Sequence, residues 1–289
     1  MKLLFTLLLC FACSANALQF KTERGVIEGS ALVNTKTGAP ELKQDTISNP
    51  KSGQLNREPA FVLGRRTNLD NNRCDLWEGP TCKYVFPAAP TQMRIVSTSA
   101  NDAAGNTGVR LLTIDYLDTN YIERSETVVT AGLTPVTTVS TNILRVNRMH
   151  SDTVGSNGSA VGVLSLTDTA GTVTYSVIPS GFVASRQAIY TVPAAKSFYV
   201  SHWQASSGAP TGSHFTIVSA RATSFNGITH AGVFASFDET GSLNNGIAIT
   251  LPIPVMVPEK VDMKLTAVSD AANAGVTALG TLMGWLEDN

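Results

Sequence analysis

The side chains that could carry acid–base or metal chemistry in this 289-residue chain are few and far apart. Metal centres are usually built from clustered imidazole, thiolate and carboxylate ligands. The histidines do not cluster in sequence, and each lies in or beside a strand-like segment: His150, His202, His214 and His230. A shared metal site would require the fold to bring these separate strands to one point. The sequence therefore predicts no metal centre and no cofactor.

Four carboxylates do lie near one another in sequence: Asp115, Asp118, Glu123 and Glu126. Paired carboxylates can hydrolyse glycosidic bonds when their separation in space is suitable. Solvent-exposed strand ends gather acidic residues in the same way, and the sequence favours this second interpretation. No serine lies in a G-x-S-x-G nucleophile elbow. We expect a protein that is not an enzyme.

Apart from Cys10 and Cys13 near the N-terminus, the chain has two cysteines, Cys74 and Cys82. Gly79-Pro80 lies between them and could turn the chain so that they form a disulfide in an oxidising compartment. Two reduced, buried thiols are the alternative, and both interpretations stay open. A zinc site would need four ligands, and no further His or Cys cluster lies nearby.

Two oxygen-rich segments, residues 68–72 and 101–102, contain side chains that could bind calcium. Neither has the EF-hand spacing, and Asn and Asp also favour turns, so we interpret both segments as turns. Asn157 begins an Asn-Gly-Ser glycosylation sequon in another turn. This sequon would be used only if the chain passes through a eukaryotic secretory pathway.

The composition is typical of an all-β protein with few charges. Hydrophobic residues make up 43% of the chain, charged residues only 15%, and the formal net charge is −1. Thr, Ser, Val, Ala and Gly are abundant, and they suit strands and turns. Between residues 151 and 240 the charged residues are Asp152, Asp168, Arg186, Lys196, Arg221, Asp238 and Glu239. These few cations cannot neutralise many phosphates, and we therefore do not expect nucleic-acid binding. A surface with so few charges suits contact with neighbouring subunits.

The N-terminal region divides into a leader and an arm. Residues 1–17 have a basic Lys2, an apolar run and an Ala15-Asn16-Ala17 cleavage site, as in a secretory signal peptide. The apolar run is too short to span a bilayer, so we expect no stable membrane anchor. An N-terminal arm that is never cleaved is the alternative. Residues 18–59 form a polar, mildly basic arm that either docks on another subunit or remains a flexible leader.

Residues 60–289 show strand patterns throughout and predict a β-sandwich or jelly-roll body. The run over 109–117 is apolar on both faces, as in a central buried strand. The run over 246–257 carries prolines, which favours an edge strand or extended segment. The remaining expected strands lie within residues 82–86, 93–99, 119–129, 144–147, 164–166, 173–177, 215–222, 228–237, 261–267 and 276–286.

Residues 186–203 stand at the centre of this body and predict a β-hairpin. Residues 189–192 and 198–200 are β-branched or aromatic, and Pro193 begins a four- or five-residue connection between them. We expect this hairpin to join two halves of one sandwich, with Lys196 as an exposed turn residue and not a catalyst.

A series of short motifs runs through the chain in a fixed order. They are RGV at 24–26 with Gly29, GRRTN at 64–68, DLWEG at 75–79, YVFP at 84–87, STSAND at 97–102 with Gly105 to Gly108, ETVV at 126–129, GSNG at 155–158, YTVPAAK at 190–196 and VPEKVD at 257–262. In this order the motifs resemble a family of virion structural proteins of tailed phages, especially aquatic ones. The resemblance covers residues 24–286, nearly the whole chain after the leader.

The resemblance implies an antiparallel β-sandwich of jelly-roll type with an extended N-terminal arm. It implies a non-enzymatic protein of the capsid surface or tail that can contribute to host attachment. Its implied partners are other virion proteins (capsid, portal or tail subunits) and copies of itself, for which a trimer is one candidate. The chain departs from the family in its signal-like leader, in an insertion over residues 38–59, and in Ala195, where a turn glycine is expected.

Two other functions would explain parts of the sequence. The leader fits a secreted or periplasmic carbohydrate-binding or adhesin module, with exposed tryptophans stacking on sugars. We nevertheless expect each of the three tryptophans, Trp77, Trp203 and Trp285, to pack in the core. A glycan-cleaving spike enzyme would need clustered carboxylates in a groove, with Asp115 or Glu123 essential.

Overall fold

The computed structural model describes residues 57–210, 212, 214–243, 246–270 and 275–289, together with the backbones of four short strands before them. The chain divides into two compact units, Met1–Asn49 and Pro50–Asn289. In the first unit, β1 (Phe20–Thr22) pairs with β2 (Gly25–Ile27), and β3 (Leu32–Val33) pairs with β4 (Pro40–Glu41). The predicted leader and the rest of the predicted arm up to residue 56 lie outside the described residues.

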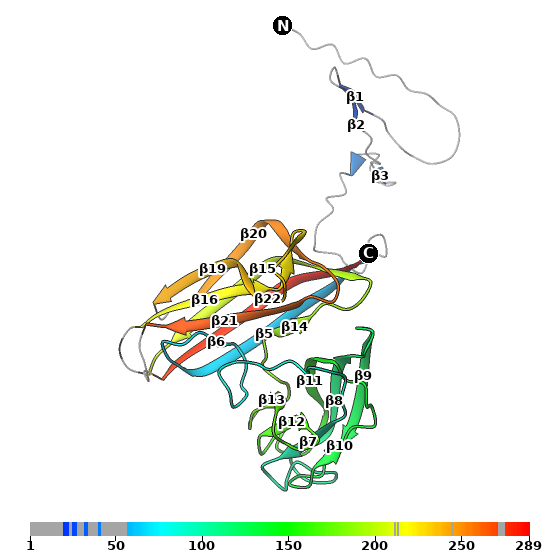
Figure 1. The fold of residues 1–289 in the computed structure, drawn as a ribbon, viewed down its shortest axis with the longest axis vertical. Coiled ribbons are helices and arrows are strands. Elements are labelled where there is room, and N and C mark those ends of the chain that lie inside the picture. Colours follow the sequence, from blue (N-terminus) through cyan, green and yellow to red (C-terminus); the bar gives the residue numbers. More distant parts are fainter. Residues whose placement is uncertain are drawn as a thin grey trace, which may run out of the picture. The chain divides into compact units, whose positions relative to one another are not determined.

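Every regular element of the described residues is a β-strand, and the paired strands run antiparallel (Figure 1). This confirms the all-β prediction and the antiparallel sandwich. The finer assignment to the jelly-roll type stays a prediction. The second unit contains two large hydrophobic cores, each enclosed by two sheets, where we expected one sandwich, and a small third cluster of Trp77, Tyr84 and Ile189.

The main lobe combines residues 57–77 with residues 188–289. One of its sheets has the order β20 (Gly246–Val257), β15 (Lys196–Gly208), β22 (Val276–Asp288), β5 (Arg57–Leu69). The facing sheet has the order β14 (Ile189–Thr191), β21 (Asp262–Ser269), β16 (Phe215–Ala222), β19 (Ala235–Leu243), and β6 (Cys74–Asp75) also pairs with β21. A small hairpin is formed by β17 (Ser224–Phe225) and β18 (Ile228–Thr229). Inward-facing side chains such as Trp203, Leu282, Val218 and Leu265 fill the core.

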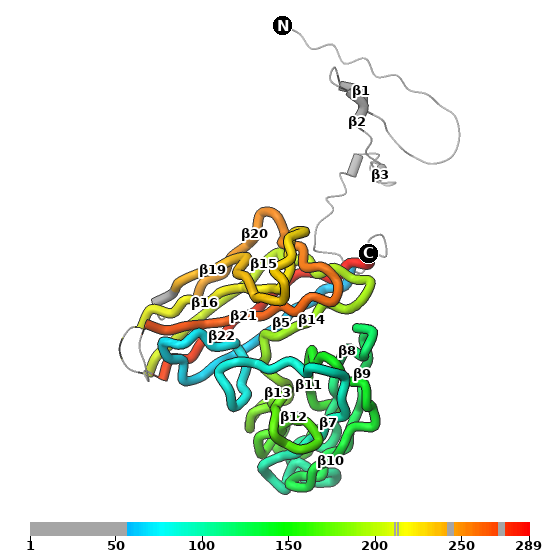
Figure 2. Tube along the Cα trace, in the orientation of Figure 1, coloured from blue at the N-terminus to red at the C-terminus, as the bar shows by residue number. Residues whose placement is uncertain are grey.

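The inserted lobe is formed by residues between β6 and β14. One sheet has the order β10 (Val136–Thr137), β7 (Met93–Ser97), β12 (Leu164–Asp168), β13 (Thr174–Ile178). The other has the order β11 (Arg145–Val154), β8 (Val109–Leu117), β9 (Glu123–Val129). In Figure 2 this segment, drawn in green, forms a lobe of its own, while the cyan strand β5 lies beside the red strand β22.

The predicted hairpin over residues 186–203 is wrong. β14 pairs with β21 and β15 pairs with β20 and β22, so the two segments belong to facing sheets. The connection crosses the sandwich because both segments bury apolar side chains toward the same core. The rings of Tyr190 and Phe198, for example, meet edge to face with centroids 5.7 Å apart.

Ala195 occupies a backbone conformation that suits glycine, with φ of 61°. Its N–H donates to Glu259 Oε2, and its carbonyl accepts from the Asn289 N–H, so the turn is held in this shape. We predict that Ala195→Gly stabilises the protein by about 0.5–1 kcal/mol, since relief of left-handed strain outweighs the entropy of an added glycine. Chemical denaturation measures the change. Ala194→Gly, where φ is not positive, is the control and should destabilise; equal effects would contradict the strain argument.

Candidate functional site

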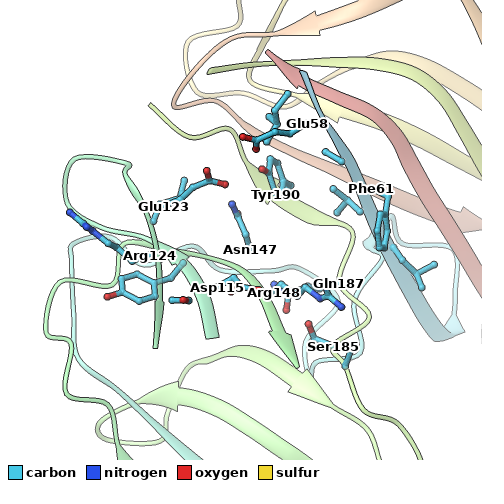
Figure 3. Close-up of a pocket in the computed structure, with 18 of the residues that line it drawn as sticks. Glu58, Phe61, Asp115, Glu123, Arg124, Asn147, Arg148, Ser185, Gln187 and Tyr190 are labelled. Carbon is cyan, nitrogen blue, oxygen red and sulfur yellow. The ribbon is translucent and has the colours of Figure 1, made fainter. Parts of the chain in front are cut away.

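A cleft of about 570 Å³ lies where the edge strand β5 of the main lobe faces the inserted lobe (Figure 3). From β5 it is lined by Glu58 to Leu63. The inserted lobe contributes Asp115, Glu123, Arg124, Asn147 and Arg148 from three neighbouring strands. The register explains this meeting, because Leu117 pairs with Glu123 and Asp115 pairs with Ser125 at one end of the sheet. A volume of this size is typical of ligand-binding clefts.

An ion cluster lies beside this cleft. Lys196 Nζ lies 2.8 Å from Glu58 Oε2 and 3.3 Å from Glu123 Oε2, and so connects the two lobes. Its side chain is only 17% exposed, so the prediction of an exposed turn residue is wrong. Burial acts to lower the pKa of Lys196, but the hydrogen bond with Glu58 and both carboxylate charges raise it above its ordinary value. The ammonium group therefore stays charged and paired.

Tyr190 contributes a neutral phenol to the wall of the cleft. Burial raises the pKa of its hydroxyl, and the charges of Glu123 and Glu58 raise it further. Its ring packs in the main core against Phe198. A phenol held neutral in this way can donate or accept a hydrogen bond, but it is a poor general base near neutral pH.

Polar side chains fix the remaining wall. Asn147 Nδ2 donates to the Thr191 carbonyl, and Asn147 Oδ1 accepts from the Thr191 N–H, at 3.0 and 2.9 Å. Gln187 Nε2 donates to the Val146 carbonyl at 3.0 Å. Arg148 is different: its side chain is exposed, it lies opposite Asp115 in the β11–β8 register, and within the described residues it makes no hydrogen bond or ion pair. Arg148 is therefore a cation of this cleft that can receive an anionic group.

The four carboxylates singled out in the sequence each have a partner of their own. Asp118 accepts from the Asn120 and Ile122 N–H groups and pairs with Arg124 at 3.1 Å. Glu126 accepts from the backbone of a turn, at Val139 and Ser140. Only Asp115, beside His150, and Glu123, beside Lys196, line the cleft.

The histidines lie in separate surroundings. His150 lies between Asp115 and Asp152, with ring nitrogens 3.4 and 3.5 Å from their carboxylates. His214 lies near Asp270, His202 contacts Thr250, and His230 packs on the Phe225 ring. Within the described residues, no group of three or more His, Cys, Asp or Glu side chains could hold a metal ion.

Cys74 and Cys82 form a disulfide in the structure, with Sγ atoms 2.19 Å apart. It closes the loop that carries Gly79 and Pro80, and the Asp75 N–H donates to the Cys82 carbonyl within that loop. The reduced alternative is therefore not the state that the structure describes.

The other residues named from sequence have ordinary structural positions. All three tryptophans are buried, including Trp285 at 7% exposure, so none presents a face for stacking on a sugar. Asn157 is exposed in its turn, with its amide bonded to Ser159. Asp70 accepts from the Asn72 N–H in a local turn. The oxygens of Asp102 accept from protein donors, which leaves no oxygen-rich cage for calcium at that position.

Sequence reasoning missed the cleft itself and the roles of Arg148 and Asp102. The structure shows why Gly108 lies near Asp102: a Cβ atom at position 108 would lie 2.1 Å from Asp102 Oδ1 and would displace this carboxylate. The described residues contain no helix long and apolar enough to cross a membrane.

Comparison with known proteins identifies no family. No family model matches the chain, and no curated protein matches it. Among solved structures, the chain is similar to one described as the structure of infectious bursal disease virus Gt strain, at 11% identity, covering 80% of this chain and 72% of that chain. The TM-score is 0.15, so this likeness supports no argument about fold or function.

Proposed function

We propose that this protein is a non-enzymatic structural component of a tailed-phage particle, located on the capsid or tail and assembled from several copies. The ordered motifs of the sequence and the antiparallel β-sandwich body support the phage assignment. The observation that carries the proposal is the outer face of the β20–β15–β22–β5 sheet, which has few charges although it faces away from the core.

The strand register assigns most side chains of this outer face to four rows. They are Met256–Tyr199–Trp285–Pro59, Thr250–His202–Met283–Phe61, Ala248–Gln204–Thr281–Leu63 and Gly246–Ser206–Leu279–Arg65. Arg65 is the only charged residue in these four rows, and the next row, Ser197–Glu287–Arg57, adds one ion pair, with Arg57 Nε 2.8 Å from Glu287 Oε2. Phe61 is 67% exposed and Leu63 is 39% exposed. A broad sheet face with exposed apolar groups, whose few charges lie at its two ends, is typical of a surface covered by another subunit.

The particle assignment predicts that purified particles of the phage that encodes this chain contain it in many copies. Mass spectrometry of such particles should detect peptides from residues 60–289 at a stoichiometry comparable to other surface proteins. Particles that lack these peptides would contradict the proposal.

The oligomer is tested separately by placing charge in the middle of the outer face. We expect the full chain to form a homo-oligomer in sedimentation experiments, and Met283→Lys or Gln204→Lys to weaken it at least tenfold, because a lysine buried in an interface loses hydration. Ser156→Lys, in an exposed turn, is the control. A wild-type monomer at all accessible concentrations would contradict self-assembly through this face.

One observation favours a second candidate, an exported binding or adhesin module. The Cys74–Cys82 disulfide is typical of proteins that fold in an oxidising compartment. N-terminal sequencing of the natural protein distinguishes the two: a start at Leu18 in an exported, particle-free protein supports export, whereas Met1 in assembled particles supports the virion proposal.

A further inference from the structure

Strand β5 presents an open edge to the cleft. It is the last strand of its sheet, and its hydrogen-bonded neighbour is β22 on the other side. Residues 58–63 of this strand line the cleft. An unpaired strand edge carries a row of free N–H and C=O groups, which is a template for an additional strand.

The direction of these groups follows from Pro59 and Arg65. Proline has no N–H, so within a regular strand its nitrogen is expected on the side away from the ladder. The Arg65 N–H donates to the Arg186 carbonyl, which is not part of β22, so this residue also points away from β22. The register is regular between them, and the pattern repeats every two residues. The backbone groups of Phe61 and Leu63 therefore point to the open edge.

Within the described residues, neither Phe61 nor Leu63 makes a backbone hydrogen bond outside the β22 ladder. Their side chains are also exposed, at 67% and 39%. This edge thus offers two donors, two acceptors and two apolar side chains to one ligand. These are the elements used when an extended peptide adds a strand to a sheet.

The opposite wall restricts the kind of ligand. Glu123, Asn147 and Arg148 of the inserted lobe face β5 across the same cleft of about 570 Å³ (Figure 3). A single strand lies about 4.8 Å from its neighbour and needs little width. The edge of a second folded copy would bring its whole sandwich against the inserted lobe. The cleft therefore fits a lone peptide strand and not another sheet.

The charges restrict the ligand further. Glu58 and Glu123 are occupied by Lys196, and Asp115 lies beside His150. Arg148, opposite Asp115 in the strand register, is exposed and without an ion pair among the described residues. An acidic side chain on the ligand would meet Arg148 in a charge-assisted hydrogen bond.

We propose that this cleft binds an extended peptide segment of a partner protein, which adds as a strand to the β5 edge at Phe61 and Leu63 and places an acidic side chain at Arg148. The ligand has alternating apolar residues beside Phe61 and Leu63. The proposal does not depend on the virion assignment, which particle composition tests separately.

The experiment selects a phage-displayed library of random heptapeptides against the immobilised full chain. We expect enriched peptides with β-branched or aromatic residues at alternate positions and one Asp or Glu. Synthetic peptides should bind with micromolar affinity by fluorescence anisotropy. Hydrogen exchange should show the Phe61 and Leu63 amides exchanging fast in the free protein and slowly in the complex. No enriched peptide, or one that protects neither amide, overturns the proposal.

Variants test the backbone contact and the charge independently. Phe61→Pro removes an N–H that the β22 ladder does not use, so the variant should fold and bind at least tenfold more weakly than Phe61→Ala, the matched control. Arg148→Glu should fold and select peptides with Lys or Arg in place of the acid. Unfolding of Phe61→Pro would contradict the outward orientation of this N–H. Unchanged binding by Phe61→Pro, or an unchanged acidic preference in Arg148→Glu, would overturn the proposed pose.

Discussion

Asp102→Ala should destabilise the inserted lobe more than removal of any other carboxylate in that lobe. Asp102 is fully buried. Its Oδ1 accepts from the N–H groups of Val109 and Val161 at 3.0 and 2.9 Å. Its Oδ2 accepts from the Gly162 N–H at 2.8 Å and from Ser97 Oγ at 2.6 Å. One side chain therefore connects three separate segments of the lobe.

Removing this carboxylate would leave three N–H groups and a hydroxyl without acceptors in the interior. We expect a loss of about 3–5 kcal/mol in the free energy of unfolding, the range for breaking a buried charged network. Asp102→Asn should cost less but still about 2 kcal/mol, because its NH2 group faces donors instead of accepting from them. Denaturation with hydrogen exchange, which separates the two lobes, measures the loss.

Asp168→Ala is the matched control. Asp168 also accepts from backbone N–H groups, at Thr172 and Val173, but in a half-buried hairpin turn. The side-chain hydrogen bond from Thr172 and the backbone bonds lower the pKa of Asp168 below its ordinary value. Water can replace these bonds, so we expect a loss of about 1 kcal/mol. A loss for Asp102→Ala no larger than this would show that Asp102 does not organise the lobe.

The sequence predicts those parts of the fold that depend on local alternation. The strands expected at 109–117, 215–222 and 246–257 have the bounds of β8, β16 and β20. The last of these, β20, is an edge strand, as its prolines indicated. Proline has no N–H to donate and so does not fit a central strand that is hydrogen-bonded on both sides. The stretch 82–86 is β-like in composition but forms no strand. The disulfide and the bond from the Tyr84 N–H to Asp75 Oδ2 hold it in another shape.

Long-range pairing could not be predicted in this way. The β5–β22 ladder joins Arg57 to Glu287, and no local pattern identifies such partners. The same alternation occurs in both lobes, so it does not reveal where one core ends and the next begins. The cleft depends on both facts, since β5 lines one wall and the inserted lobe lines the other. The sequence therefore contains the residues that line the cleft but does not reveal that they lie close together in space.

Asp75→Asn should destabilise the main lobe by leaving a buried cation without its counter-ion. Asp75 is fully buried on β6, and Lys264 Nζ on β21 lies 3.0 Å from its carboxylate. The Tyr84 N–H also donates to Asp75, and the Lys264 ammonium lies over the Phe234 ring at 4.0 Å. Breaking one partner of such a pair costs about 3–5 kcal/mol, because the remaining charge keeps its desolvation penalty.

The loss of stability in Asp75→Asn should become smaller as the pH rises. Burial lowers the pKa of Lys264 below its ordinary value, although Asp75 opposes the shift. The unfolded state then binds more protons than the folded state between the folded pKa and about 10.4, so stability rises with pH in that window. Without the Asp75 charge the folded pKa falls further and the window widens. Asp75→Asn should therefore recover more stability than the wild type on raising the pH from about 7 to about 9.5.

The double variant Asp75→Asn/Lys264→Met separates the charge effect from lost packing. Lys264→Met alone leaves a buried carboxylate without its cation and should also cost about 3–5 kcal/mol. Removing both charges leaves neither uncompensated, so the double variant should be less destabilised than the sum of the two single variants by at least about 2 kcal/mol. It should also lose the pH dependence described above. Additive losses in urea denaturation would show that the two side chains act separately, and that the pair does not hold β6 against β21 through its charges.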